Sequence, residues 1–206
     1  MLLKIYDENP SPKLIRQIVD CLNDGGIIIY PTDTVYGIGG SIHKPKAVER
    51  ISQIKGIPLS QANFSLLCNN LSDLSTYAKP LNNNIYRAMR KCLPGPYTFI
   101  IPASSNVPKL FMSKKKTVGI RVPDNSIIQA IITELGHPIV STSIEIDHET
   151  VEYTIDPELI HEKYEQFVDI VIDGGFGDVK GSTIFDCTGD DIEVIREGKG
   201  SIDFLG

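Results

Sequence analysis

The sequence has no tryptophan, only four cysteines and no apolar run approaching the length that crosses a bilayer. No two cysteines form a Cys-x-x-Cys pair, so neither a zinc site nor a disulfide framework is indicated. We expect Cys21, Cys68, Cys92 and Cys187 to be small core residues of a reduced protein. The sequence therefore predicts a cytoplasmic protein that does not associate with membranes.

The histidines and the basic residues form few patterns that indicate a binding site. The four histidines show no metal-ligand spacing, and we predict no metal site. The net charge of −6 argues against a protein that coats nucleic acid, because such binding needs many cationic contacts to phosphate. One basic cluster, Lys109 with residues 114–116, is a candidate phosphate surface, although a solvated loop rim is the favoured interpretation.

Three familiar catalytic motifs are missing. The sequence contains no G-x-S-x-G, no G-x-x-x-x-G-K-[ST] and no H-E-x-x-H. This excludes the nucleophile elbow, the common phosphate-binding loop and the zinc-protease helix that these motifs form. A function has to be sought in another arrangement of polar residues.

The sequence does contain β-branched runs that alternate with helical segments over 206 residues. Three helices are expected to begin at prolines, where the missing N–H would be unpaired in any case. They start at Pro12, Pro45 and Pro157, and Ser11 and Asp156 are candidate N-caps. Further helices are expected at 71–77, 83–91 and 126–135, and strands at 27–30, 64–68, 97–101, 117–122, 139–143, 168–172, 183–187 and 192–197. The mixture predicts a single α/β domain over residues 1–206, a twisted mixed sheet with packed helices.

The most informative segment follows the strand expected at 27–30. Pro31 ends that strand because it has no N–H to pair. Thr32, Asp33 and Thr34 come next. Gly37, Gly39 and Gly40 follow, and we expect them to let backbone approach a ligand closely or take positive φ. In open α/β sheets ligands lie beyond the carboxyl ends of strands, so a site is predicted here. The alternative is an ordinary polar loop in which Asp33 forms a turn or caps a helix.

Other strands also end in hydroxyl groups or cations. Arg121 lies inside an apolar strand, so it is either paired with a core carboxylate or directed at an anionic ligand. Together with it, several other polar residues suit a compact anionic ligand such as a nucleotide phosphate or a carboxylate. They are Lys55, Ser141, Ser143, Ser182 and Arg196.

Six segments together resemble one known family in order and spacing. They are Tyr30-Pro-Thr-Asp-Thr-Val-Tyr-Gly37, Lys55-Gly-x-Pro58, Pro94-Gly-Pro-Tyr-Thr-Phe99, Val118-Gly-Ile-Arg-Val-Pro123, Pro138-Ile-Val-Ser-Thr-Ser143 and Ser182-Thr-Ile-Phe-Asp186. This pattern is similar to the YrdC-like family, over nearly the whole chain. The resemblance implies threonylcarbamoyl-AMP synthase chemistry, a nucleotidyl transfer that converts threonine, bicarbonate and ATP into threonylcarbamoyl-AMP and pyrophosphate for tRNA modification. It also implies a concave sheet face and binding of double-stranded RNA.

The resemblance assigns roles to residues of this chain. It implies that Thr34, Arg121 and Ser182 surround the threonine, and that Arg121 holds the carboxylate. The residues implied for the nucleotide are Lys55, Ser141, Ser143 and Arg196. ATP with Mg²⁺ is then a substrate and no tightly bound cofactor is expected. Catalysis would consist of alignment and charge stabilisation, with no individual catalytic residue assigned.

Two departures from the synthase pattern fall in the nucleotide half. Synthases carry Lys-x-Arg where this chain has Ile57, and Ser-x-Asn where it has Glu145. Asp147, Glu149 and Glu152 follow closely, and their negative field would oppose a triphosphate. These substitutions, with segment 61–68, resemble the YciO-like branch of the family. We therefore expect reduced or altered synthase activity.

Two functional hypotheses of different class follow. The first is an enzyme, a threonylcarbamoyl-AMP synthase or a relative acting on a nucleotide and a small carboxylate. The second is a binding module for double-stranded RNA or a nucleotide without efficient synthesis. Small-molecule substrates and tRNA or double-stranded RNA are the partners that these hypotheses imply. The sequence leaves the true substrate and the oligomeric state open.

Overall fold

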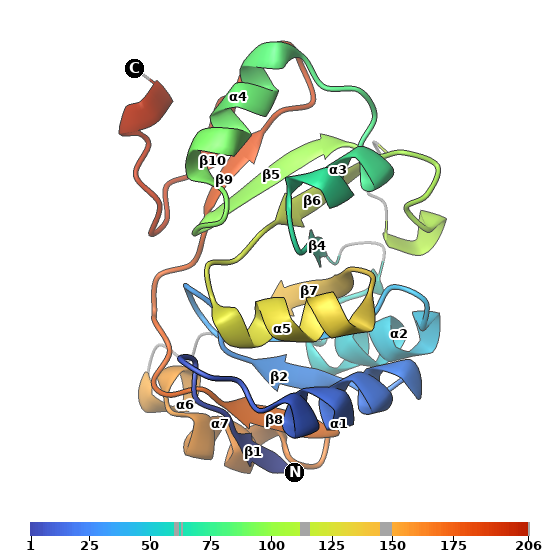
Figure 1. The fold of residues 1–206 in the computed structure, drawn as a ribbon, viewed down its shortest axis with the longest axis vertical. Helices are drawn as coiled ribbons and strands as arrows, with labels where there is room; N and C mark the ends of the chain where they lie inside the picture. Colours follow the sequence, from blue (N-terminus) through green and yellow to red (C-terminus); the bar gives the residue numbers. More distant parts are fainter. Residues whose placement is uncertain (60–61, 63, 112–115, 145–149, 206) are drawn as a thin grey trace.

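A single mixed sheet forms the centre of the molecule (Figure 1). The structure, a computed structural model, describes residues 1–59, 62, 64–111, 116–144 and 150–205. The strands are β1 (Leu2–Lys4), β2 (Ile28–Tyr30), β3 (Gly37–Ser41), β4 (Ser65–Leu67), β5 (Tyr97–Pro102), β6 (Thr117–Arg121), β7 (Ile139–Ser143), β8 (Ile170–Asp173), β9 (Thr183–Asp186) and β10 (Glu193–Arg196). Their spatial order is β1-β8-β2-β3-β7-β4-β6-β5-β9-β10, with both parallel and antiparallel neighbours. The expected α/β fold with a mixed sheet is confirmed.

The helices are α1 (Pro12–Asn23), α2 (Pro45–Ile54), α3 (Leu71–Tyr77), α4 (Asn83–Cys92), α5 (Ser126–Leu135), α6 (Glu152–Ile155) and α7 (Pro157–Tyr164). Two short 3₁₀ turns, η2 (Lys109–Phe111) and η3 (Asp203–Leu205), complete the described elements. The three proline starts are confirmed. Asp156 caps α7 by accepting from the Glu158 N–H at 2.9 Å, whereas the Ser11 hydroxyl makes no cap hydrogen bond to α1. None of the described helices is long and apolar enough to cross a membrane.

The glycine-rich stretch that follows Tyr36 is strand β3 and not a loop. It lies between β2 and β7, and its residues are buried. A Cβ on Gly37 would lie 2.8 Å from the Tyr30 ring, and one on Gly39 would lie 2.6 Å from Ile139 Cγ2. Glycine is therefore needed for close packing between neighbouring strands, and the expectation of a ligand-facing glycine loop is wrong at Gly39.

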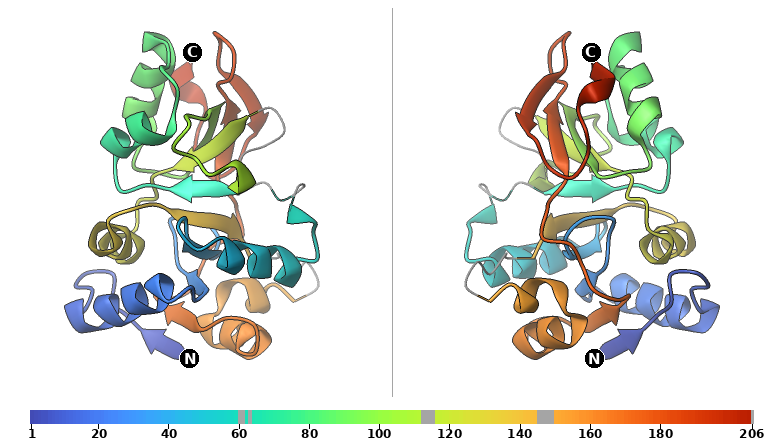
Figure 2. Two further views of the ribbon diagram at one scale, coloured as in Figure 1. Left: turned by 90° about the vertical axis from the view of Figure 1, so that its right-hand side faces the viewer. Right: turned by 90° about the vertical axis from the view of Figure 1, so that its left-hand side faces the viewer.

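Two clusters of buried side chains cover the sheet. Helices α2, α3, α4 and α7 contribute to the larger cluster, and α1 and α5 to the smaller. Figure 2 shows α1 and α5 together on one side of the N-terminal part of the sheet, with α7 on the other. Because side chains alternate along a strand, residues next to core positions point to the opposite face. Phe99, Ile120 and Val140 belong to the larger cluster, so their neighbours are available for a site on the other face.

Candidate functional site

A pocket of about 250 Å³ opens on the sheet face opposite the larger core cluster. Residues of β3, β7, β4, β6, β5, β9 and β10 line it, so it spans the middle of the sheet. Five of the predicted site residues are among its lining: Arg121, Ser141, Ser143, Ser182 and Arg196. Side chains from positions 121 to 196 are therefore brought together by strand order.

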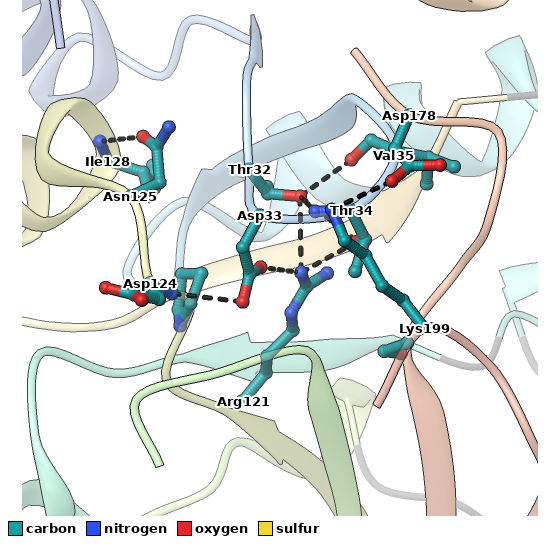
Figure 3. Close-up of polar contacts among 12 residues, drawn as sticks. Thr32, Asp33, Thr34, Val35, Arg121, Asp124, Asn125, Ile128, Asp178 and Lys199 are labelled. Carbon is teal, nitrogen blue, oxygen red and sulfur yellow. Dashed lines mark hydrogen bonds and ion pairs between the residues drawn. The ribbon is translucent and has the colours of Figure 1, made fainter. Parts of the chain in front are cut away.

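Arg121 is the best-connected polar side chain of the pocket (Figure 3). Its Nη2 donates to Thr34 Oγ1 at 2.7 Å and to Thr32 Oγ1 at 3.2 Å, and it forms an ion pair with the Asp33 carboxylate. The side chains of Arg121 and Asp33 are each only 10% exposed. The turn after β2 therefore supplies three oxygens to one nitrogen, because Pro31 directs the chain out of the sheet at that point.

Asp33 also holds the segment that leads from β6 to α5. Its second oxygen accepts from the Asp124 N–H at 3.1 Å. The N-cap of α5 is Asn125, whose side chain accepts from the Ile128 N–H at 3.1 Å. Asp33 is thus a counterion for Arg121 and not a helix cap.

One nitrogen of the Arg121 guanidinium has no hydrogen bond to a described residue. Its Nε is buried and has no hydrogen-bond partner in the part of the chain that the structure describes. A buried donor without an acceptor costs about 1–3 kcal/mol, so the site favours an incoming oxygen. One of the two alternatives posed by the sequence holds in part: Arg121 is paired with the Asp33 carboxylate and also lines the pocket.

Hydroxyl groups line the pocket on either side of Arg121. Tyr30 Oη donates to Ser141 Oγ, and Thr98 Oγ1 shares a hydrogen bond of 2.8 Å with Ser182 Oγ. Burial raises the pKa of Tyr30 far above its usual value, so the phenol keeps its proton and donates it. Ser141 then has its own proton available for a ligand in the pocket.

Arg196 brings a second guanidinium from the edge strand β10. Its Nε and Nη2 donate to the Ser182 carbonyl at 3.2 and 2.8 Å. A Cβ on Gly181 would lie 2.9 Å from Arg196 Nη2, so the Arg196 side chain packs closely against this glycine. Two cations therefore reach one hydroxyl-lined pocket from β6 and β10.

Lys55 and Thr34 lie just outside the pocket lining. Lys55, at the C-terminal end of α2, donates from Nζ to the Ser143 carbonyl at 2.8 Å. Thr34 is buried and accepts a hydrogen bond from Arg121, so it would influence a ligand only through the position of the Arg121 side chain. The acidic departures Glu145, Asp147 and Glu149, the lysines at 114–115, and positions 61 and 63 of segment 61–68 lie outside the described residues.

Ser65 and Thr98 are lining residues with hydroxyl groups that sequence reasoning missed. Each sits in an apolar strand next to a core residue, Leu66 or Phe99. The signal that could have found them is the period-2 alternation, which places a hydroxyl on the face opposite the core. Within the described part of the chain, no three His, Cys, Asp or Glu side chains gather as a candidate metal site.

Comparison with known proteins places the chain in a family. A family model described as "Telomere recombination", which covers Sua5, YciO and YrdC proteins, matches residues 20–198. The YciO protein of Escherichia coli (strain K12) is 42% identical over 200 residues, which cover 96% of this chain and 95% of that protein. The chain therefore belongs to the Sua5/YciO/YrdC family, which confirms the resemblance and its YciO-like branch.

Solved structures of related proteins have the same fold. The crystal structure of E. coli YciO matches with a TM-score of 0.91 and 40% identity, and 98% of each chain is covered. P. abyssi Sua5 complexed with L-threonine matches in fold with a TM-score of 0.87 and 23% identity, over all of this chain and 59% of that one. A threonylcarbamoyl-AMP synthase of Vibrio vulnificus (strain YJ016) is 28% identical over 166 residues, which are 80% of this chain and 88% of that enzyme.

Proposed function

We propose that the chain binds an amino-acid carboxylate and ATP in the pocket around Arg121 and forms threonylcarbamoyl-AMP slowly. In this reaction threonine, bicarbonate and ATP give threonylcarbamoyl-AMP, pyrophosphate and water. The observation that carries the proposal is Arg121 itself, which lines a pocket rich in hydroxyl groups and whose buried Nε has no acceptor among the described residues. A carboxylate oxygen is the acceptor that best matches a guanidinium edge.

The chain's residues would act by alignment. Arg121 would hold the carboxylate while Ser182 and Thr98 accept or donate hydrogen bonds beside it. Arg196, on the far side of Ser182, would stabilise negative charge on the transferred phosphate. ATP would enter as its Mg²⁺ complex, because that ion is commonly carried by substrate phosphates and few protein ligands.

Relatives support this assignment. The matched P. abyssi Sua5 structure holds L-threonine, and the matched Vibrio enzyme is a threonylcarbamoyl-AMP synthase. The slow rate is proposed because Ile57 replaces a guanidinium of the synthase pattern. Ile57 is half-buried, with its N–H donating to the Ser52 carbonyl at 3.2 Å, so the position is held by α2 and would present a longer side chain from a fixed backbone.

The test is pyrophosphate release with threonine, bicarbonate and ATP, with mass detection of the adenylate. We expect measurable but slow turnover, and Ile57→Arg should raise it together with ATP affinity. One restored charge-assisted contact is worth about 1.5–3 kcal/mol, or roughly one to two decades of affinity. The matched control is Gln53→Arg, an exposed position near the end of α2 that adds the same charge.

A binding module without synthesis is the second candidate, and Ile57 is the residue that favours it. That function predicts ATP or RNA binding by calorimetry with no adenylate formed by the wild type or by Ile57→Arg. Turnover of the wild type as fast as that of a synthase with the full motif would contradict our account of Ile57. Absence of threonine binding would contradict the role proposed for Arg121.

A further inference from the structure

Charge is unevenly distributed along this chain. Residues 74–123 contain nine Lys or Arg and no Asp or Glu. The remaining residues hold 11 basic and 26 acidic side chains, so the net charge of −6 hides one strongly basic segment. Of the nine cations, Arg121 is neutralised by Asp33 inside the pocket region, and four others, Lys79, Arg87, Arg90 and Lys91, lie on α4 or just after α3.

The exposed side of α4 is basic. Arg87, Arg90 and Lys91 are exposed beside Tyr86, which is 42% exposed. These four residues occupy two neighbouring rows of the helix surface, at spacings of three and four. None of the three cations makes an ion pair with any residue that the structure describes. The opposite side of α4 carries Met89 and other residues of the larger core cluster, so the basic side faces away from the sheet.

An apolar hollow of about 400 Å³ adjoins this basic surface, between α3 and α4. Lys79 and Tyr86 are part of its lining, and none of the described residues that line it is acidic. Its apolar lining consists of Leu71, Leu74, Ala78, Pro80 and Leu81. The hollow therefore suits an apolar side chain that is presented with negative charges around it.

The opposite end of the molecule offers such a side chain. On α7, Glu158 and Glu162 are exposed one helical turn apart, and neither makes an ion pair with a described residue. Glu165 continues the same row, and Phe167 follows with 53% of its surface exposed. The Phe167 carbonyl accepts from Arg50 Nη2 at 3.3 Å, which fixes the backbone that carries the ring.

These two surfaces lie at opposite ends of the long axis. Figures 1 and 2 show α3 and α4 at one end and α7 at the other in every view. We propose that a second copy of this chain docks head to tail, with Phe167 of one copy in the α3–α4 hollow of the next. Glu158 and Glu162 then face Arg87 and Arg90 across the contact. Because the two surfaces differ and lie at opposite ends, the contact is heterologous and generates open chains of molecules.

The association should be weak and sensitive to salt. One aromatic side chain and a few exposed charges make a small interface, which is typical of transient contacts. The Debye length falls from about 10 Å at 0.1 M salt to about 3 Å at 1 M, so the charged part of the contact is lost at high salt. Both surfaces are separate from the pocket, so the association is independent of the function proposed above.

Sedimentation velocity of the full chain over a range of concentrations tests this. We expect the sedimentation coefficient to rise with protein concentration at about 0.1 M salt and to stay at the monomer value at about 1 M. Phe167→Ser should weaken self-association at least roughly tenfold, as expected for a central aromatic anchor. Phe176→Ser is the control, because Phe176 is 76% exposed elsewhere and its loss should change nothing.

Charge exchange gives the sharper test. The variant R87E/R90E has two acidic ends and the variant E158K/E162K has two basic ends, so neither should self-associate alone. A mixture of the two should associate again. The control K13E/K46E changes two exposed lysines on α1 and α2 by the same net charge and should behave like the wild type.

Several outcomes would overturn the proposal. A sedimentation coefficient that is independent of concentration and salt would do so, as would association that survives Phe167→Ser or a mixture of charge variants that stays monomeric. A monomeric protein that binds a fluorescent 16-nucleotide RNA duplex through Arg87 and Arg90 would assign the basic surface to nucleic acid instead.

Discussion

Arg121 shows how one residue can be both structural and available to a ligand. Its Nη2 satisfies Thr34 and Asp33, while its buried Nε has no acceptor among the described residues. The pairing with Asp33 keeps the guanidinium in place beside the pocket that Arg121 lines. The combination of a structural and a ligand-facing role depends on the planar arrangement of the guanidinium nitrogens and not on charge alone.

Replacing Arg121 by lysine separates the two roles. Arg121→Lys keeps a cation for Asp33 but loses the fork, so L-threonine affinity should fall by about ten- to a hundredfold, with little change in melting temperature. Titration calorimetry and thermal unfolding measure the two effects. In the control Arg121→Met, the carboxylate of Asp33 loses its counterion, and a loss of about 3–5 kcal/mol is expected. Unchanged affinity with a large loss of stability in Arg121→Lys would show a purely structural residue.

At the scale of elements, sequence reasoning succeeded where a local signal exists. Proline starts located α1, α2 and α7, and the apolar runs located β4, β5, β6, β7, β9 and β10 to within a few residues. It missed β1 and β3. Strand β3 has the sequence Gly-Ile-Gly-Gly-Ser, which resembles a loop because its need for glycine comes from β2 and β7, distant segments that no local pattern reveals. The contact between Asp33 and Arg121 was not predicted either, because it also joins two segments that are distant in the sequence.

A methyl group inside β3 tests this explanation. Gly39→Ala places a Cβ 2.6 Å from Ile139 Cγ2 and 2.8 Å from the Val140 carbonyl, so neighbouring strands must move apart. We expect a loss of about 1–3 kcal/mol in the free energy of unfolding, measured by denaturant titration. The control Gly189→Ala meets no atom within 4 Å and should be close to neutral. Equal stability of the two variants would contradict close packing as the reason for Gly39.

An ion pair formed by the segment after β10 should make the stability of the fold depend on pH. Lys199 pairs with Asp178 at 2.8 Å, and the hydrogen bond from Lys199 lowers the pKa of that carboxyl below its usual value. A carboxyl with a lowered pKa stabilises the fold above its ordinary pKa of about 4, and this contribution is lost as the pH falls further. At neutral pH Asp178→Asn should cost roughly 0.2–1 kcal/mol, as expected for a partly exposed pair.

Denaturant titrations over a pH series check this expectation. The difference between wild type and Asp178→Asn should shrink steadily once the pH is below about 4. Lys199→Met should lose a similar amount at neutral pH, and the double variant should lose no more than either single one. A difference that stays constant down to pH 2 would show that the ion pair is not its cause.

At the scale of the whole molecule, strand order decides where the site lies. Neighbours in the middle of the sheet come from distant parts of the sequence: β3 pairs with β7, and β5 pairs with β9. This order gathers Arg121, Ser182 and Arg196 around one pocket on the sheet face opposite the larger core cluster. The sequence showed that polar residues end or interrupt strands, but their convergence depends on a topology that it did not specify.

The pairing of β1 with β8 has a consequence for how the chain acquires its structure. Leu2 lies opposite Val171 and Lys4 opposite Asp173, so the first strand has no partner until the last third of the chain is present. Closing such long loops carries an entropic cost before any contact repays it, and refolding is expected in the slower range of milliseconds to seconds. On the ribosome, β1 should remain protease-sensitive until β8 has emerged. Stalled chains ending before and after residue 173, with an extension that fills the exit tunnel, would show whether protection appears at that point.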